Sequence, residues 1–229
     1  QDEVAIVTGG GTGIGLTVAA ELRSLGAKVA ICGRRPEPLE KAKESLGGDE
    51  HAFAATCDIR DPESIATYVE AVKSRFGRVD ILVNNAGGQF PSPAQHLKPK
   101  GFEAVVRNNL LGTYNFTHTT ANLAFIPQQR GRIVNVIAQI ARGFPGMSHT
   151  GAARAGVANL TKSLAVEWAQ FGIRVNAVAP GVIRTSGLDQ YPPELTALST
   201  SAIPLRRLGS AQEVSHLIVY LASTFADFV

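Results

Sequence analysis

A glycine-rich stretch near the start of the chain, TGGGTGIG from Thr8 to Gly15, could hold a phosphate group. Glycines let a backbone turn sharply and approach a ligand closely, and the first turn of a following helix offers unpaired N–H groups to negative charge. The stretch lies between an apolar run and a segment of helical spacing, which is the context of a dinucleotide-binding loop rather than of a plain tight turn. We predict that a nucleotide pyrophosphate contacts Gly9, Thr12, Gly13, Ile14 and Gly15.

Two arginines follow the second apolar run. Arg34 and Arg35 stand where an NAD-selective protein would carry an acid for the ribose 2′-hydroxyl. A guanidinium binds phosphate through paired planar donors, so these arginines favour NADPH; the alternative is a helix entry with two solvated arginines. After the third apolar run, Asp58 and Ile59 are expected beside the adenine, with Asp58 accepting a bond from its amino group unless it is only a turn residue.

The elements that must position these residues alternate along the chain. Short apolar, β-branched runs are separated by segments with helical spacing, a pattern that predicts a parallel sheet covered by helices on both faces. We therefore expect one α/β domain over residues 1–229, a Rossmann-type doubly wound sheet in three layers. The predicted strands are Val4–Val7, Lys28–Cys32, Ala52–Cys57, Ile81–Val83, Ile133–Ile137 and Ile173–Ala179, and the predicted helices are Ile14–Leu25, Pro38–Leu46, Pro62–Phe76, Lys100–Phe125, Gly151–Phe171 and Ala211–Ala222.

Helix boundaries carry their own signals. Asp61 before Pro62 is a typical helix start, and Gly26, Gly77 and Gly172 are typical helix ends. The polar, proline-containing segment Thr185–Pro204 is less regular, and we expect it to form an excursion that covers a substrate.

The composition is that of a packed globular protein, with 45% hydrophobic and 18% charged residues among 229. A net charge of +3 is too small and too scattered for nucleic-acid binding. No apolar run is long enough to cross a membrane, and no basic leader precedes one, so we expect a cytoplasmic protein. Cys32 and Cys57 are interpreted as small buried hydrophobes rather than as a disulfide, and no metal site is predicted.

Several ordered motifs together resemble the short-chain dehydrogenase/reductase family, over essentially the whole chain. They are TGGGTGIG, NNAG at Asn84–Gly87, NNLLG at Asn108–Gly112, GRIVNV at Gly131–Val136 and RVNAVAPGVIRT at Arg174–Thr185. The family's last strand and its terminal glycine-rich stretch have no counterpart before Val229, so we expect either that the chain is truncated there or that its tail is not represented in the sequence.

The resemblance implies roles position by position. Asn109 matches the family's active-site asparagine, although a helix-interior Asn satisfied by backbone is the alternative. The residues Asn84, Asn85, Ala86 and Gly87 would support the central strand and line the cofactor, and Pro180, Gly181, Ile183 and Thr185 would contact its nicotinamide end.

The chain departs from the family at the proton relay. The family's serine position falls near Ile137 and Ala138, its tyrosine position is Thr150, and its lysine position is Arg154. Neither a threonine hydroxyl nor a permanently charged guanidinium can replace the usual relay near neutral pH. Arg154 can still hold the nicotinamide ribose and place a positive charge beside the reacting centre.

This set of residues suits the reduction of an activated carbon–carbon double bond. The segments GGQFPSPAQH (Gly87–His96) and HTGAARAGVANLTKSLAVEWA (His149–Ala169) resemble the peroxisomal trans-2-enoyl-CoA reductases and, more distantly, the 2,4-dienoyl-CoA reductases. The resemblance implies an NADPH-dependent reductase of the 2,3 double bond of an enoyl-CoA, with Asn109, Thr150 and Arg154 as catalytic residues, and it leaves a peroxisomal location open. The alternatives are a carbonyl reductase with an atypical proton route and a non-catalytic NADPH-binding sensor or scaffold.

Other polar residues are candidates near this site. Thr150 is the first choice as a donor to the thioester oxygen, while substrate contact by Ser148 and His149 competes with helix capping or solvent exposure. Gln89 is a weaker substrate candidate, Gln139 is weaker still, and Lys162 lies too far along the helix to act as a base. Trp168 and Phe171 are expected in the core or at a subunit interface. The helices Lys100–Phe125 and Gly151–Phe171 resemble the pair through which family members form dimers and tetramers, so a homo-oligomer is expected.

Overall fold

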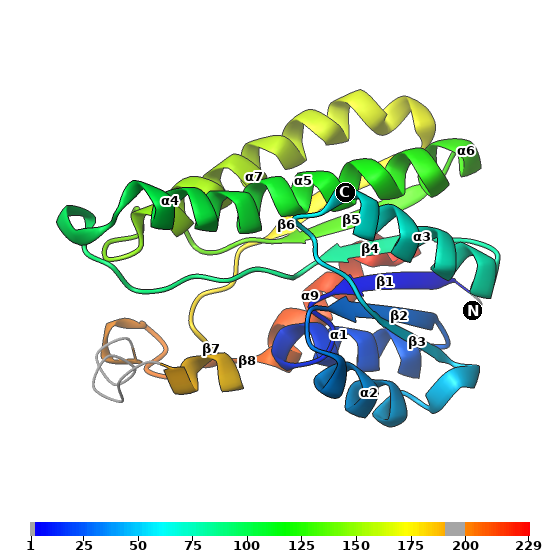
Figure 1. Ribbon diagram of the computed structural model, residues 1–229, viewed down its shortest axis with the longest axis horizontal. Coiled ribbons are helices and arrows are strands. Elements are labelled where there is room, and N and C mark those ends of the chain that lie inside the picture. The colour runs from blue at the N-terminus through cyan, green and yellow to red at the C-terminus, as the bar shows by residue number, and fades with distance from the viewer. Residues whose placement is uncertain (1–2, 191–199) are drawn as a thin grey trace.

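Six parallel strands form one sheet in the order β3-β2-β1-β4-β5-β6 in a computed structural model that describes residues 3–190 and 200–229 (Figure 1). The strand order reverses between β1 and β4, which creates a crevice at the carboxyl ends of these strands. The predicted doubly wound sheet is therefore confirmed. The strands are β1 (Val4–Thr8), β2 (Lys28–Gly33), β3 (Ala52–Thr56), β4 (Ile81–Asn84), β5 (Gly131–Val136) and β6 (Ile173–Val178).

Helices cover both faces of the sheet, because successive strand residues point to opposite sides. Val7 of β1 packs in one hydrophobic core with Val18 and Ile218, and its neighbour Ile6 packs in a second core with Phe116 and Leu164. Figure 1 shows the resulting three layers. The first core lies under α1 (Gly13–Ser24), α2 (Pro36–Ser45) and α9 (Ala211–Ala222), and the second lies under α3 (Pro62–Phe76), α5 (Gly112–Thr120) and α7 (Ser148–Trp168).

The long helix predicted over Lys100–Phe125 is present but is not a regular α-helix. Two π-helical turns, at Arg107–Leu111 and Ala121–Phe125, separate its α-helical parts α4 (Pro99–Val106), α5 and α6 (Ile126–Gln128). Gly112, directly after the first π turn, packs so tightly that a β-carbon there would lie 2.7 Å from Ile59 Cδ1. The helix and the β3–α3 loop can therefore approach closely only because this residue has no side chain.

Helix α7 starts at Ser148, three residues before the predicted Gly151. Met147 is the non-helical residue before it, and the Met147 N–H donates to the Phe144 carbonyl at 3.0 Å, so the preceding loop turns directly into the helix. The early start puts Ser148, His149 and Thr150 into the first turn of the helix. Trp168 and Phe171, at the other end, pack against the second core, as predicted.

The segment predicted to cover the substrate, Thr185–Pro204, is described only at its ends. Strand β7 (Ile183–Arg184) pairs with β8 (Gly209–Ser210) and so ties the start of the segment to the start of α9. Residues 191–199 lie outside the described residues, so the covering role stays a prediction. None of the described helices has the length and apolar character needed to span a bilayer.

Candidate cofactor and substrate site

The glycine turn after β1 has the backbone of a phosphate-binding loop. Gly9 (φ 64°) and Gly13 (φ 55°) adopt left-handed conformations that other residues avoid. Thr12, the residue before α1, makes no side-chain capping bond, and the first turn of α1 holds no acidic residue. The N–H groups of that turn are therefore free to bind an anion, and they lie at the crevice between β1 and β4. The loop fits a pyrophosphate.

The NNAG motif after β4 holds this turn in place. The Thr8 hydroxyl accepts the N–H groups of Asn85 (3.0 Å) and Ala86 (2.9 Å), and the Asn85 amide donates to the Thr8 carbonyl at 3.0 Å. A β-carbon on Gly15 would lie 2.5 Å from the Asn85 amide nitrogen, so only glycine fits there. The predicted cofactor residues Gly9, Gly15, Asn85 and Ala86 thus form one packed unit.

Asn84, one residue earlier, belongs to a buried polar chain between the sheet and its helices. Its amide donates to the Thr117 hydroxyl on α5 at 2.7 Å and to the Asn135 side-chain oxygen on β5 at 2.9 Å. The Asn135 amide in turn donates to the Thr161 hydroxyl on α7 at 2.9 Å. Because each of these buried amides is satisfied, the chain fixes β4, β5, α5 and α7 relative to one another.

The far end of the crevice is charged. Arg60 holds the Asp58 carboxylate through two nitrogens, Nε to Oδ1 at 2.9 Å and Nη2 to Oδ2 at 2.5 Å. This guanidinium, with a smaller contribution from the charge of Arg34, lowers the pKa of Asp58 to about 2. Arg34 and Arg35 are both exposed. Asp58 is therefore an anion near neutral pH, and its contact with adenine stays a prediction.

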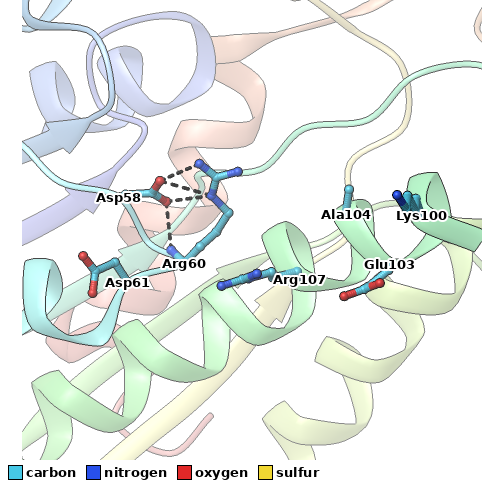
Figure 2. A pocket seen from close by; sticks show the side chains of 7 residues that line it. All are labelled: Asp58, Arg60, Asp61, Lys100, Glu103, Ala104 and Arg107. Carbon is cyan, nitrogen blue, oxygen red and sulfur yellow. Dashed lines mark hydrogen bonds and ion pairs between the residues drawn. The ribbon is translucent and has the colours of Figure 1, made fainter.

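A cavity of about 430 Å³ opens beside Asp58, between the β3–α3 turn and helix α4 (Figure 2). Its charged lining balances three basic side chains against three acidic ones, so it does not select an anion by charge alone. The lining residues are Asp58, Arg60, Asp61, Lys100, Glu103, Ala104 and Arg107.

Arg154 is a buried cation at the other end of the crevice. Its side chain is 8% exposed, and Nη1 donates to the Val136 carbonyl at the end of β5 at 2.8 Å. None of the ion pairs found among the described residues includes it. Burial lowers the pKa of Arg154 to about 10, which leaves the group charged near neutral pH. Its second nitrogen, Nη2, lies against Gly87, where a β-carbon would collide with it.

Asn109 lies in the first π-helical turn and faces the same glycines. Its side-chain amide donates to the Gly88 carbonyl at 2.7 Å and to the Val105 carbonyl at 3.0 Å, and its oxygen accepts the Gly88 N–H at 3.3 Å. All these partners are backbone groups, as the alternative interpretation of Asn109 expected. A π turn inside a helix often marks a functional site. Asn109 thus positions the loop that passes Arg154.

Thr150 and His149 are completely buried at the start of α7. The Thr150 hydroxyl lies 3.4 Å from His149 Nδ1, and the Thr150 backbone N–H donates to that nitrogen at 2.8 Å. Solvent exposure, one of the alternatives for His149, is therefore wrong, whereas Ser148 is exposed. Phe90 lies against His149 with ring centroids 4.7 Å apart.

The segment after β6 returns to the phosphate loop. A β-carbon on Gly13 would lie 3.5 Å from Thr185 Cγ2, and Ile183 packs against the first core. The Pro180 carbonyl accepts the N–H of Gln139 at 3.1 Å, which joins this segment to the loop after β5. Pro180 and Thr185 therefore border the crevice, whereas Lys162 is exposed farther along α7 and takes no part in it.

Some residues of the site were not singled out by the sequence analysis. Thr8, Gly88, Phe90 and Arg60 contact predicted site residues, yet none was predicted to have a role of its own. Thr8 opens the TGGGTGIG motif and Gly88 directly follows NNAG, so their position was a usable signal. Phe90 lies in the GGQFPSPAQH segment, but a single aromatic residue in a loop does not reveal which side chain it contacts.

The sheet order, the glycine turn at its reversal point and the crevice beyond it define a dinucleotide-binding α/β protein. The family model described as short chain dehydrogenase matches residues 3–195. The chain belongs to the short-chain dehydrogenase/reductase family of oxidoreductases, as its motifs predict.

Relatives with named activities match over the full chain. A Bacillus subtilis (strain 168) protein named probable 2,4-dienoyl-CoA reductase, (2E)-enoyl-CoA-producing, is 36% identical over 235 residues, which cover 100% of this chain and 92% of the relative. A Danio rerio protein named peroxisomal 2,4-dienoyl-CoA reductase, (3E)-enoyl-CoA-producing, is 37% identical over 237 residues, covering 100% and 78%. The resemblance to the dienoyl-CoA reductases is thereby confirmed.

Solved structures agree with the fold. The citronellol catabolism dehydrogenase AtuB of Pseudomonas aeruginosa PAO1 superposes with a TM-score of 0.88 at 42% identity, covering 100% of this chain and 90% of that one. A variant of actinorhodin polyketide ketoreductase, solved with NADPH, superposes with a TM-score of 0.92 at 33% identity, covering 99% and 92%.

Proposed function

We propose that this chain reduces the 2,3 double bond of an enoyl-CoA thioester with NADPH. The observation that carries the proposal is the buried guanidinium of Arg154 beside Gly87, which forms no ion pair with any described residue and has Thr150, not a tyrosine, one helical turn before it. A buried charge without a counter-charge is costly unless a ligand compensates it. Ribose hydroxyls and the negative charge that develops on a substrate would do so.

Reduction of this double bond requires hydrogen-bond donors from the protein, whereas carbonyl reduction also requires an acid that protonates the oxygen. When bound, NADPH supplies the hydride that adds to the β-carbon of the enoyl group, and a proton reaches the α-carbon. Negative charge collects on the thioester oxygen, which needs hydrogen-bond donors rather than a strong acid. Thr150, at the first turn of α7, offers such a donor, and Arg154 adds a fixed positive charge to the same region.

Selection of NADPH is assigned to Arg34, with a secondary role for Arg35. Arg34 is exposed at the end of β2 and close enough to Asp58 to influence its pKa. An exposed guanidinium there can pair with a 2′-phosphate at little cost to the internal packing. The names of the full-length relatives support an acyl-CoA substrate.

A homodimer or homotetramer and a cytoplasmic location, with the peroxisome as the alternative, remain part of the proposal. The assembly would use the long helices, where Leu111, Tyr114 and Val166 leave apolar surface exposed.

The test uses purified protein with NADPH and crotonyl-CoA or a longer enoyl-CoA, and it follows the loss of NADPH absorbance. We expect oxidation with enoyl-CoA that is faster with NADPH than with NADH. Clear turnover of a ketone or an alcohol, without oxidation by any enoyl thioester, would reject the proposal.

Carbonyl reduction is the second candidate, and the NADPH-containing ketoreductase among the similar structures favours it. Acetoacetyl-CoA and crotonyl-CoA, compared at equal concentration, distinguish the two reactions. Tight NADPH binding without turnover across both substrates would instead support a sensor or scaffold.

A further inference from the structure

The proton of the His149 imidazole has a defined position. The Thr150 backbone N–H, which can only donate, is shared between the Met147 carbonyl at 3.0 Å and His149 Nδ1 at 2.8 Å. Nδ1 must therefore be an acceptor, and the ring proton belongs on Nε2. Since the two nitrogens project to different sides of the ring, the Nε2–H faces away from this amide.

This N–H has no partner among the described residues, although the side chain is 0% exposed. An unsatisfied buried donor is costly, so a native structure rarely keeps one without a use for it. His149 also stands at the positive end of α7, a helix of 21 residues, where negative charge is stabilised. A donor in that place suits an oxygen that becomes negative.

The surroundings of His149 belong to the reaction site. Thr150 follows it directly, and Arg154 lies one helical turn beyond Thr150 on the same face of α7. Phe90 comes from the loop whose Gly87 and Gly88 contact Arg154 and Asn109, and its ring stands at 87° to the imidazole. A β-carbon on Gly101 of α4 would lie 3.0 Å from Phe90 Cζ, so this ring fills the space between α4 and α7.

We propose that the Nε2–H of His149 hydrogen-bonds the carbonyl oxygen of the thioester substrate, and that Phe90 moves aside to admit it. The proposal rests on the acyl-CoA function proposed above and gives one residue of that site its role. Because His149 is fully buried, a ligand reaches it only when a neighbour moves. Phe90, on a loop and 41% exposed, is placed to do so.

The first test observes the imidazole directly by NMR of protein labelled with ¹⁵N-histidine. Long-range correlations report which ring nitrogen carries the proton, and the His149→Gln variant assigns the signals. We expect Nε2 to be protonated in the free protein, and its resonance to move when NADP⁺ and butyryl-CoA are added. A proton on Nδ1, or an Nε2 resonance unmoved by butyryl-CoA, overturns the proposal.

The second test compares two substitutions of His149 in turnover of crotonyl-CoA. His149→Phe keeps the ring volume without a donor and is expected to lower kcat by about 10²–10³, the effect of losing one oxyanion donor. His149→Gln, whose amide can reach the Nε2 position, should keep kcat within about tenfold of wild type. NADPH affinity, followed by fluorescence, should stay unchanged in both variants, since the donor contacts substrate only.

The matched controls are His216→Phe and His216→Gln, because His216 is a mostly exposed histidine on α9 that faces Glu21. A kcat equal to that of wild type in His149→Phe would overturn the proposal. So would a loss of NADPH affinity large enough to explain the whole fall in turnover. If wild type oxidises no NADPH with enoyl-CoA, the proposed function fails, and the NMR titration alone decides the role of His149. If His149→Phe does not fold, His149→Gln and the wild-type titration still decide it.

Discussion

Asn109 and Gly88 hold each other through two hydrogen bonds, one in each direction, although 21 residues separate them in the chain. The side-chain amide of Asn109 donates to the Gly88 carbonyl at 2.7 Å, and the Gly88 N–H donates back to Oδ1 at 3.3 Å. The π-helical turn therefore acts as a clamp on the loop after β4, and this loop passes Arg154. The position of the loop after β4 and the shape of the π-helical turn are therefore coupled through Asn109.

Replacing Asn109 tests the clamp. Asn109→Leu keeps the volume but leaves the Gly88 and Val105 backbone groups without their partner, so we expect a loss of about 1–3 kcal/mol in the free energy of unfolding. Urea denaturation without cofactor measures it. Asn122→Leu is the matched control, because the Asn122 amide donates to His118 from an exposed place on the second π turn. Equal losses in the two variants would contradict a special role for Asn109.

Arg154 is expected to lower the free energy of unfolding while it contributes to NADPH binding and to turnover. Arg154→Met removes a buried charge that no described residue neutralises, so the free energy of unfolding without cofactor should equal or exceed that of wild type. NADPH affinity and enoyl-CoA turnover should fall by at least about tenfold, because a charge-assisted contact is lost. Arg154→Lys keeps the charge and should retain more of both. A variant that is less stable yet binds NADPH normally would show that Arg154 is only structural.

Arg34 is expected to set the preference for the nucleotide. Arg34→Ala should weaken NADPH binding by about 10–100-fold and leave NADH binding unchanged, since a hydrogen bond to a charged group is worth about 1.5–3 kcal/mol. Steady-state kcat/KM with each nucleotide measures the preference. Lys41→Ala, at an exposed ion pair on α2, is the control for a general loss of positive charge. An unchanged preference for NADPH over NADH in Arg34→Ala would show that Arg34 does not set it. The same measurement on Arg35→Ala would then decide whether Arg35 does.

The ion pair between Asp58 and Arg60 predicts that the free energy of unfolding decreases at acid pH. The pKa of Asp58 lies at about 2, below its ordinary value of 3.8, because Arg60 binds the carboxylate. A depressed folded-state pKa contributes stability that is complete above pH 3.8 and is lost as the pH falls toward 2. Since both side chains are about a third or more exposed, the contribution should stay below about 1 kcal/mol.

The measurement is an NMR titration of the Asp58 side-chain carbon in wild type and in Arg60→Ala. The variant should titrate closer to the ordinary value, and its unfolding free energy should depend less on pH over that interval. The same midpoint in both proteins would show that another group lowers this pKa.

The sequence alone predicts most of the scaffold but less of the site. Strand positions follow from short apolar runs, and helix α9 occurs at the predicted bounds Ala211–Ala222 because Ser210 and Glu213 form a capping box. Periodicity cannot reveal the π turns, since one inserted residue changes a 3.6-residue pattern too little to be seen.

Contacts between side chains distant in sequence were also beyond prediction. The Phe90 ring lies against His149, which is 59 positions later in the chain, and nothing in the sequence pairs the two residues. Likewise, Arg60 follows Asp58 by two positions, but only the folded turn brings its guanidinium onto the carboxylate. Family motifs predict which residues surround the cofactor, whereas the contacts particular to this chain had to come from the structure.

The two π turns also determine where the long helix can lose a residue without a change in rotational phase. Each turn holds one residue more than an α-helical turn would, so deleting a single residue from either one would leave a regular α-helical turn and keep the downstream residues in the same rotational phase. Deleting a residue from an α-helical part would instead rotate everything downstream by about 100° about the helix axis. A deletion within Arg107–Leu111 would therefore keep Phe116 in the second core, whereas a deletion from the part of α5 just before Phe116 would turn this side chain away from it. Length changes in this helix should thus be tolerated according to where they fall, not how many residues they remove.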